Sequence, residues 1–120
     1  MTIPEVLASD RVLVLTARDK KSAVDQLVDT LCDRVPNLDR EAIRARVLER
    51  EDALSSRMSE LIAIPHAIIE TMESTVAAVG LSPDGIPWDT GRETPVHLAV
   101  LLVGNRDQHL DVLREFATRL

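Results

Sequence analysis

The sequence predicts an α/β domain in which a mixed β-sheet is sandwiched between helices. Short apolar runs typical of buried strands occur at residues 12–15, 75–81 and 96–103. Between and after them, apolar residues recur at every third or fourth position, as they do in amphipathic helices. Because the two patterns interleave along the chain, a layered α/β arrangement accounts for both.

The length and composition are those of one domain. The chain has 120 residues, of which 45% are hydrophobic, so residues 1–120 can fill a single core. The longest strongly apolar run, 98–103, is far too short to cross a bilayer, and the N-terminus has no signal-peptide pattern. We therefore expect a cytoplasmic protein without membrane insertion. The single cysteine, Cys32, lies in a helical apolar pattern, which favours a small buried side chain.

The charge and the residue types exclude several kinds of partner. A formal net charge of -6 argues against a nucleic-acid partner, because phosphate backbones are bound by clustered Lys and Arg. The three histidines have no zinc spacing, and the acidic residues form no calcium loop. We therefore predict neither a metal nor a cofactor.

The first strand, at 12–15, is followed by two predicted helices. Apolar residues at 20–35 form one helical stripe, which ends before a proline. Asn37 or Asp39 can cap a second helix, which runs to about Asp52. The first part of the chain is thus a strand and two helices.

A short apolar strand then runs into a proline and a histidine. Residues 53–60 have no periodicity and predict a loop, whereas 62–64 resemble the end of a buried strand. Pro65 has a fixed φ and no N–H, so the strand should stop there and the backbone that carries His66 should be stiff. This is a favourable position for a nucleophile.

The next segments complete the predicted sheet. Residues 67–74 are compatible with a loop or a short helix, and a strand follows at 75–81. Residues 82–85 predict a type I turn, with Pro at its second position and Gly at its fourth. Residues 86–89 form a short edge piece at most, because their proline cannot donate to a ladder. The run at 96–103 is almost continuously apolar, which is typical of a central strand.

A last helix is predicted after the polar break at 104–107, with apolar residues at helical spacing up to Leu120. His109 lies in its first turn, where backbone N–H groups favour an anion. No C-cap signal follows Leu120, so we expect a C-terminally truncated form of the natural domain. His97, near the start of the central strand, is interpreted as structural.

Several motifs, in order along the chain, carry a resemblance to a known family. They are Arg50-Glu51, Ile-Ala-Ile-Pro-His-Ala at 62–67, Gly-Ile-Pro-Trp-Asp at 85–89, Pro-Val-His-Leu at 95–98, and His109-Leu110. Together they resemble the fructose/mannitol-type (type 2) enzyme IIA domain of the bacterial phosphoenolpyruvate-dependent sugar phosphotransferase system (PTS). The nitrogen-regulatory branch of that system shares the domain. The resemblance covers nearly the whole chain and implies an α/β sandwich.

The resemblance implies a phosphoryl carrier. His66 would accept a phosphoryl group from the histidine phosphocarrier protein HPr, or from its nitrogen-branch counterpart, and pass it to an enzyme IIB. Arg50 and His109 match the arginine and second histidine that surround the phosphate in the family. Imidazole chemistry agrees, since a largely neutral ring can attack phosphorus without a separate base or a metal. Two alternatives stay open: a regulatory module whose phosphorylation state controls binding of a target protein, and a degenerate binding domain.

The chain departs from the family pattern in the loop before His66. The family usually has glycines where this chain has Arg57, Ser59 and Leu61, and glycines let the backbone approach phosphate closely. The departure therefore bears on catalytic competence. As a hypothesis, Arg57 compensates as a second cation beside the site. The segment before His109 is also shorter than usual, and a final helix common in the family is absent.

Overall fold

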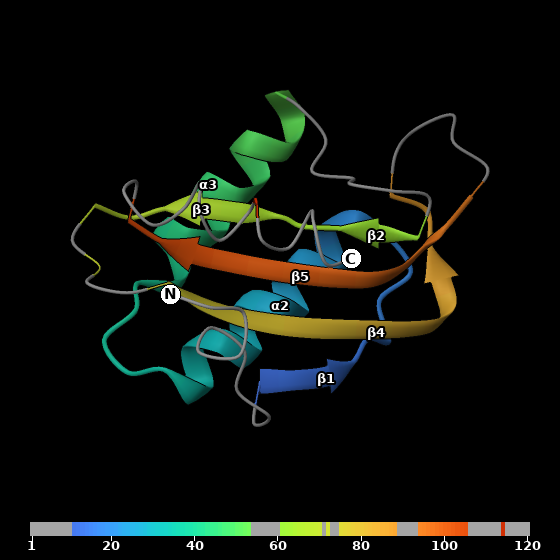
Figure 1. Cartoon of the computed structure of the whole chain (residues 1–120), viewed down its shortest axis with the longest axis horizontal. Helices are drawn as coiled ribbons and strands as arrows, with labels where there is room; N and C mark the ends of the chain where they lie inside the picture. Colours follow the sequence, from blue (N-terminus) through green and yellow to red (C-terminus); the bar gives the residue numbers. More distant parts are fainter. Residues whose placement is uncertain are drawn as a thin grey trace.

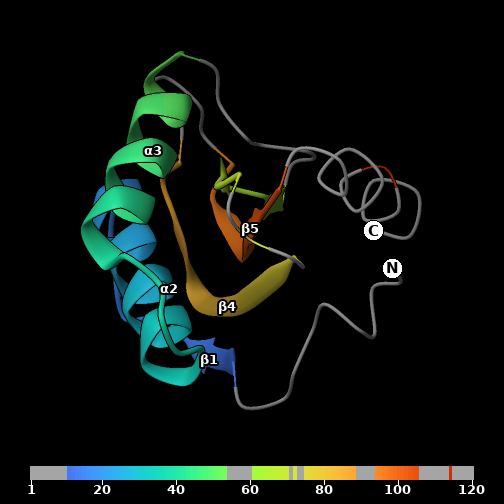
Figure 2. The ribbon, with the colours of Figure 1, turned by 90° about the vertical axis from the view of Figure 1, so that its left-hand side faces the viewer.

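The computed structural model describes residues 11–53, 61–70, 72, 75–88, 94–105 and 114. The described elements are, in chain order, β1 (Val12–Val14), α2 (Lys20–Arg34), α3 (Arg40–Ala53), β2 (Ile62–Ala63), β3 (His66–Ile68), β4 (Val76–Ile86) and β5 (Val96–Gly104). The five strands form one mixed sheet, and both helices pack on the same face of it (Figures 1 and 2). This confirms the predicted α/β class. Nearly all of the predicted last helix lies outside the described residues.

Both helices begin at aspartate caps. The backbone N–H of Ser22 donates to the Asp19 carboxylate at 2.8 Å, ahead of α2. The N–H of Ala42 donates to the Asp39 carboxylate at 3.1 Å, ahead of α3. Of the two predicted caps of the second helix, Asp39 is therefore the one used, whereas Asn37 has a left-handed φ of 66° in the connection. Both helices are confirmed, and neither has the length and apolar composition of a membrane-spanning helix.

The sheet is built around β5. Its strand order is β1-β4-β5-β2, and β3 also pairs with β5. β4 and β5 are antiparallel, whereas β1 runs parallel to β4, and β2 and β3 run parallel to β5. The prediction of a central last strand is thus confirmed.

The main core lies between the helices and the sheet. Apolar residues of α2 and α3 meet those of β4 and β5 there, and they are almost completely buried. Among them are Leu27, Leu31, Ile43, Val47, Ala78, Leu101 and Val103. A smaller cluster on the other face consists of Ile64, Ala77, Val100 and Leu102.

The prediction that the strand stops at Pro65 is wrong in one respect. β2 ends at Ala63, but the chain pairs with β5 again from His66 onward. The reason is that the Pro65 carbonyl accepts a hydrogen bond from the N–H of Leu102 at 3.0 Å, so the chain stays beside β5. A proline lacks a donor but keeps its acceptor. His66 is consequently the first residue of β3, and Ala67 continues the strand.

The predicted turn at 82–85 is a bulge inside one strand. β4 extends to Ile86, and five steps along it, from Leu81 to Ile86, match two steps along β5. The N–H of Gly85 donates to the Ser82 hydroxyl at 3.1 Å, and Gly85 has a φ of 83°. The prediction of a turn that ends the strand is therefore wrong, because Ile86 pairs with β5 again after the bulge.

Candidate functional site

The position of His66 is fixed by the buried residues that precede it in the chain. Pro65 and Ile64 are buried, whereas the imidazole is half-buried at the start of β3. The ring Nδ1 lies 3.0 Å from the Ile64 carbonyl oxygen. A carbonyl can only accept a hydrogen bond, so Nδ1 carries the proton of the neutral ring. The lone pair of His66 is therefore on Nε2.

Arg50 meets this lone pair from the last turn of α3. Its Nε donates to His66 Nε2 at 3.3 Å. The structure thus brings together two of the three residues that the sequence predicts for the site. An arginine offers five N–H donors in a planar fork, so Arg50 can bind His66 through Nε and keep other donors for an anion.

The third predicted residue, His109, lies outside the described residues, and so does Arg57. His97 is described and lies elsewhere. Its Nδ1 is 2.8 Å from the Ser82 carbonyl oxygen, beside the bulge of β4. This bond agrees with the structural interpretation of His97.

Arg46, a second arginine at the site, is missing from the sequence-based prediction. It lies one turn before Arg50 on α3, and its Nη1 donates to the Ile68 carbonyl at 3.0 Å. Ile68 is the last residue of β3, two residues after His66. Arginines four residues apart share one helix face, so this spacing was the available signal.

A buried ion pair holds the last turn of α3. The Glu51 side chain is only 2% exposed, and its Oε2 is 3.3 Å from the Nζ of Lys20, the first residue of α2. The same Nζ lies 5.7 Å from the ring centroid of Trp88, a cation–π distance. Because Glu51 follows Arg50 directly, this pair also fixes the turn from which Arg50 reaches His66.

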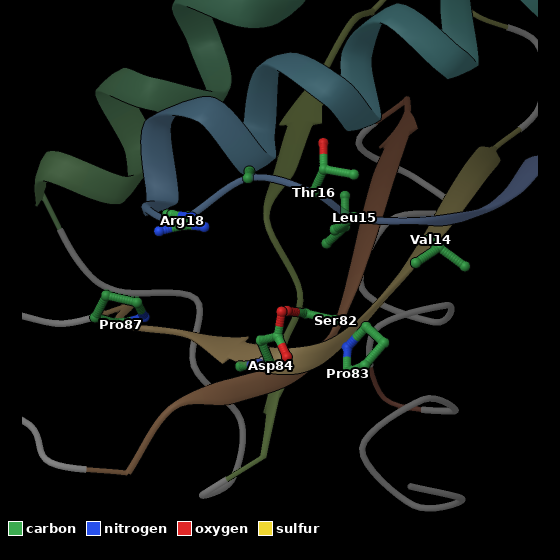
Figure 3. Close-up of a pocket in the computed structure, with 10 residues that line it drawn as sticks. Val14, Leu15, Thr16, Arg18, Ser82, Pro83, Asp84 and Pro87 are labelled. Carbon is green, nitrogen blue, oxygen red and sulfur yellow. Dashed lines mark hydrogen bonds between the residues drawn. The ribbon is translucent and has the colours of Figure 1, made fainter.

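A separate hollow of about 680 Å³ lies beside the bulge of β4. Figure 3 shows Arg18, just before α2, on one side of it and Asp84, in the bulge, on the other. Its lining is formed by residues 14–18, 82–85 and 87. His66 and the two arginines do not line this hollow, and they lie instead where α3 meets β3.

The comparisons with known proteins point to one family. Residues 5–120 match the family model described as phosphoenolpyruvate-dependent sugar phosphotransferase system, EIIA 2. The chain belongs to this enzyme IIA family. It is 31% identical over 125 residues to the fructose-specific EIIABC component of Bacillus subtilis, a match that covers 100% of this chain. The enzyme IIA chain spans only 20% of the length of that relative.

Solved enzyme IIA structures share the fold. Nitrogen regulatory protein IIA-Ntr from Neisseria meningitidis matches with a TM-score of 0.85 at 21% identity, over 98% of this chain and 82% of that one. The Escherichia coli complex of enzyme IIA mannitol with phosphorylated enzyme IIB mannitol matches with a TM-score of 0.79 at 17% identity, over 93% of this chain and 79% of that one. Proteins of the family are phosphotransferase components, and both sugar-specific and nitrogen-regulatory proteins are similar to this chain.

Proposed function

We propose that this enzyme IIA chain is a phosphoryl carrier of the sugar phosphotransferase system, working in the cytoplasm. His66 accepts a phosphoryl group from an HPr-like phosphocarrier and passes it to an enzyme IIB. The single observation that carries the proposal is the arrangement of the ring, with Nδ1 bound to the Ile64 carbonyl and Nε2 facing a guanidinium. Enzyme IIA mannitol, a structural neighbour, forms a complex with its phosphorylated enzyme IIB, which supports this choice of acceptor.

The transfer balances without an added base. Arg50 releases the Nε2 lone pair of His66, which attacks phosphorus, and the bond between phosphorus and the donor nitrogen breaks with its electron pair going to the donor ring. The donor phosphohistidine enters protonated on its other ring nitrogen and leaves as a neutral imidazole. His66 keeps its Nδ1 proton, which stays hydrogen-bonded to the Ile64 carbonyl, and the ring becomes a phosphoimidazolium. Transfer to an enzyme IIB reverses these changes in the His66 ring.

Arg50 supplies the positive charge for this step. The transferring phosphoryl group has a loose transition state with negative charge on its three oxygens, so the protein contributes position and charge. A guanidinium forms short, charge-assisted bonds to such oxygens. The expected contribution of Arg50 is about 3 kcal/mol, similar to that of one oxyanion-hole donor. We propose His109 as a further donor, in agreement with its match to the family motif.

The test is phosphorylation by phosphoenolpyruvate, enzyme I and HPr, or the nitrogen-branch counterparts of these proteins, followed by intact-mass measurement. The parent protein gains one phosphoryl group, which acid removes. His66→Ala gains none, and His109→Ala is labelled more slowly. His97→Asn is the matched histidine control, because an amide can still donate to the Ser82 carbonyl. A parent that stays unlabelled with every donor leaves the degenerate binding domain as the function.

A regulatory role is the second candidate, because a nitrogen regulatory protein is among the structural neighbours. In that case His66 is phosphorylated, but the change of charge controls binding of a target protein. Mixing the phosphorylated chain with enzyme IIB proteins separates the two roles. A carrier loses its phosphoryl group to an enzyme IIB cysteine, whereas a regulator keeps it and changes its affinity for the target.

A further inference from the structure

We propose that Arg46 is a second phosphate-binding arginine at the His66 site. This inference rests on the proposed phosphorylation of His66. In the unphosphorylated protein, Arg46 binds the Ile68 carbonyl through one nitrogen. When His66 carries a phosphoryl group, the guanidinium of Arg46 turns to an oxygen that Arg50 does not bind.

The first support is position. Arg46 and Arg50 are one helical turn apart, which corresponds to about 6 Å along α3. Their partners, Ile68 and His66, are two residues apart, which corresponds to about 7 Å along β3. The two guanidinium groups therefore contact the same short strand at positions two residues apart.

The second support is the strand edge on which the contact lies. The Pro65 carbonyl and the Ile69 N–H both bond to β5. Backbone groups alternate between the two edges of a strand, so the Ile68 carbonyl faces away from β5. Arg46 thus contacts β3 on the edge opposite β5, where no other described strand pairs with it.

The third support is charge. The other two arginines on α3 are neutralised by α2: Arg40 pairs with Asp29 and Asp33, and Arg44 pairs with Asp25. Within the described part of the chain, no carboxylate forms an ion pair with Arg46 or Arg50. Although the net charge of the chain is -6, Arg46 and Arg50 thus remain beside β3 with no ion-pair partner among the described residues.

The exchange of partners is favourable. Arg46 gives up one bond to a neutral carbonyl and gains a charge-assisted bond to a phosphoryl oxygen, which is about twice as strong. Three phosphoryl oxygens also offer more acceptor sites than Arg50 alone can fill. We therefore expect loss of Arg46 to slow phosphorylation about tenfold, less than the loss of Arg50, which already touches Nε2 in the resting protein.

The first experiment compares Arg46→Gln, Arg46→Lys and Arg44→Gln. The last is the matched control, since it removes the same charge from the same helix on the side that faces α2. We expect about tenfold slower phosphorylation in Arg46→Gln, an intermediate rate in Arg46→Lys and an unchanged rate in Arg44→Gln. Arg46 also covers a strand edge, so thermal unfolding is measured for each variant. A rate that falls only in proportion to the folded fraction overturns the proposal.

The second experiment needs no donor protein. Phosphoramidate phosphorylates histidine directly and releases ammonia, so it separates this inference from recognition of HPr. On labelling of His66, the side-chain N–H signals of Arg46 should shift in a ¹H–¹⁵N spectrum, and those of Arg44 should not. Unmoved Arg46 signals in the labelled protein overturn the inference but leave the carrier function intact. Failure to label His66 with phosphoramidate and with every donor overturns both.

Discussion

A histidine has two ring nitrogens that can bond to phosphorus. In this molecule one backbone carbonyl determines which of them carries the proton and which keeps the lone pair. The Ile64 carbonyl oxygen accepts a hydrogen bond from the Nδ1–H of His66 at 3.0 Å, and this leaves the Nε2 lone pair for Arg50. The choice depends on the path of the chain through Pro65. Because that path keeps the strand beside β5, the chain itself fixes the orientation of the ring.

We expect unphosphorylated His66 to be the Nδ1–H tautomer. The physical reason is that the Ile64 carbonyl can only accept a hydrogen bond. A two-bond ¹H–¹⁵N correlation spectrum at a pH where the ring is neutral shows which nitrogen carries the proton. An Nε2–H tautomer would contradict the assignment of Nε2 as the nucleophile.

Arg50→Lys tests whether the shape of the guanidinium matters or only its charge. Lysine keeps the charge but loses the planar fork of N–H donors that can bind two phosphoryl oxygens at once. We expect phosphorylation to slow about a hundredfold in this variant, measured by rapid quenching and mass spectrometry. A rate close to that of the parent would show that charge alone is sufficient.

The thiol of Cys32 should react slowly. Burial raises its pKa above the ordinary value, and the nearby Arg40 guanidinium opposes this only in part. A higher pKa means less thiolate at neutral pH, so alkylation by iodoacetamide is slower than for a free cysteine and speeds up as the pH rises. Denaturant should restore the ordinary rate. Equal rates in folded and unfolded protein would refute the prediction.

At the residue scale, the sequence could identify only part of the site. The motif around His66 and the match of Arg50 to the family pattern were enough to name this pair. The burial of Glu51 was not predictable, because its partner Lys20 belongs to another helix and a helical pattern does not show which acidic residue finds a cation. The spacing of Arg46 from Arg50 placed both on one helix face, but the sequence did not show that this face meets β3.

At the scale of elements, the Lys20–Glu51 pair joins the beginning of α2 to the end of α3. The Lys20 side chain is 24% exposed and the Glu51 side chain 2%. Both charged groups of such a pair lose hydration on folding, which offsets much of their mutual attraction. The pair therefore contributes mainly by fixing the arrangement of the two helix ends. Here it enforces the position of the turn that carries Arg50.

Glu51→Gln should destabilise the protein by about 3 kcal/mol, because it leaves the Lys20 ammonium in a poorly hydrated site without its carboxylate. Urea unfolding measures this loss. The exposed Glu49→Gln on the same helix is the control and should change the stability little. The double variant Lys20→Met with Glu51→Leu should recover much of the stability. If Glu51→Gln matches the control, the pair does not hold the turn.

Periodicity predicted the helices well and the irregular strands poorly. The stripes of α2 and α3 were visible because a core covers one side of each helix. The bulge in β4 and the interruption between β2 and β3 were harder, because both depend on which residues β5 places opposite them. A proline or a turn motif shows that a ladder is interrupted, but it does not show whether pairing resumes on the other side.

At the scale of the whole molecule, the alternation of strands and helices was sufficient to predict the α/β class. It did not reveal the order of the strands. The sheet order β1-β4-β5-β2, with β3 also on β5, joins segments that are distant in the sequence. Such pairing is decided by the shared core, and local patterns carry little information about it.

The central position of β5 has a consequence for the protein while it is still being made. β2 and β3 pair with β5, which comes after every other described strand in the chain. A nascent chain on the ribosome can form α2 and α3 early. β3, however, cannot pair with β5 until residues 96–104 have left the exit tunnel. The strand pairing that holds His66 beside Arg50 therefore becomes possible only after β5 has been synthesised, and shorter nascent chains lack it.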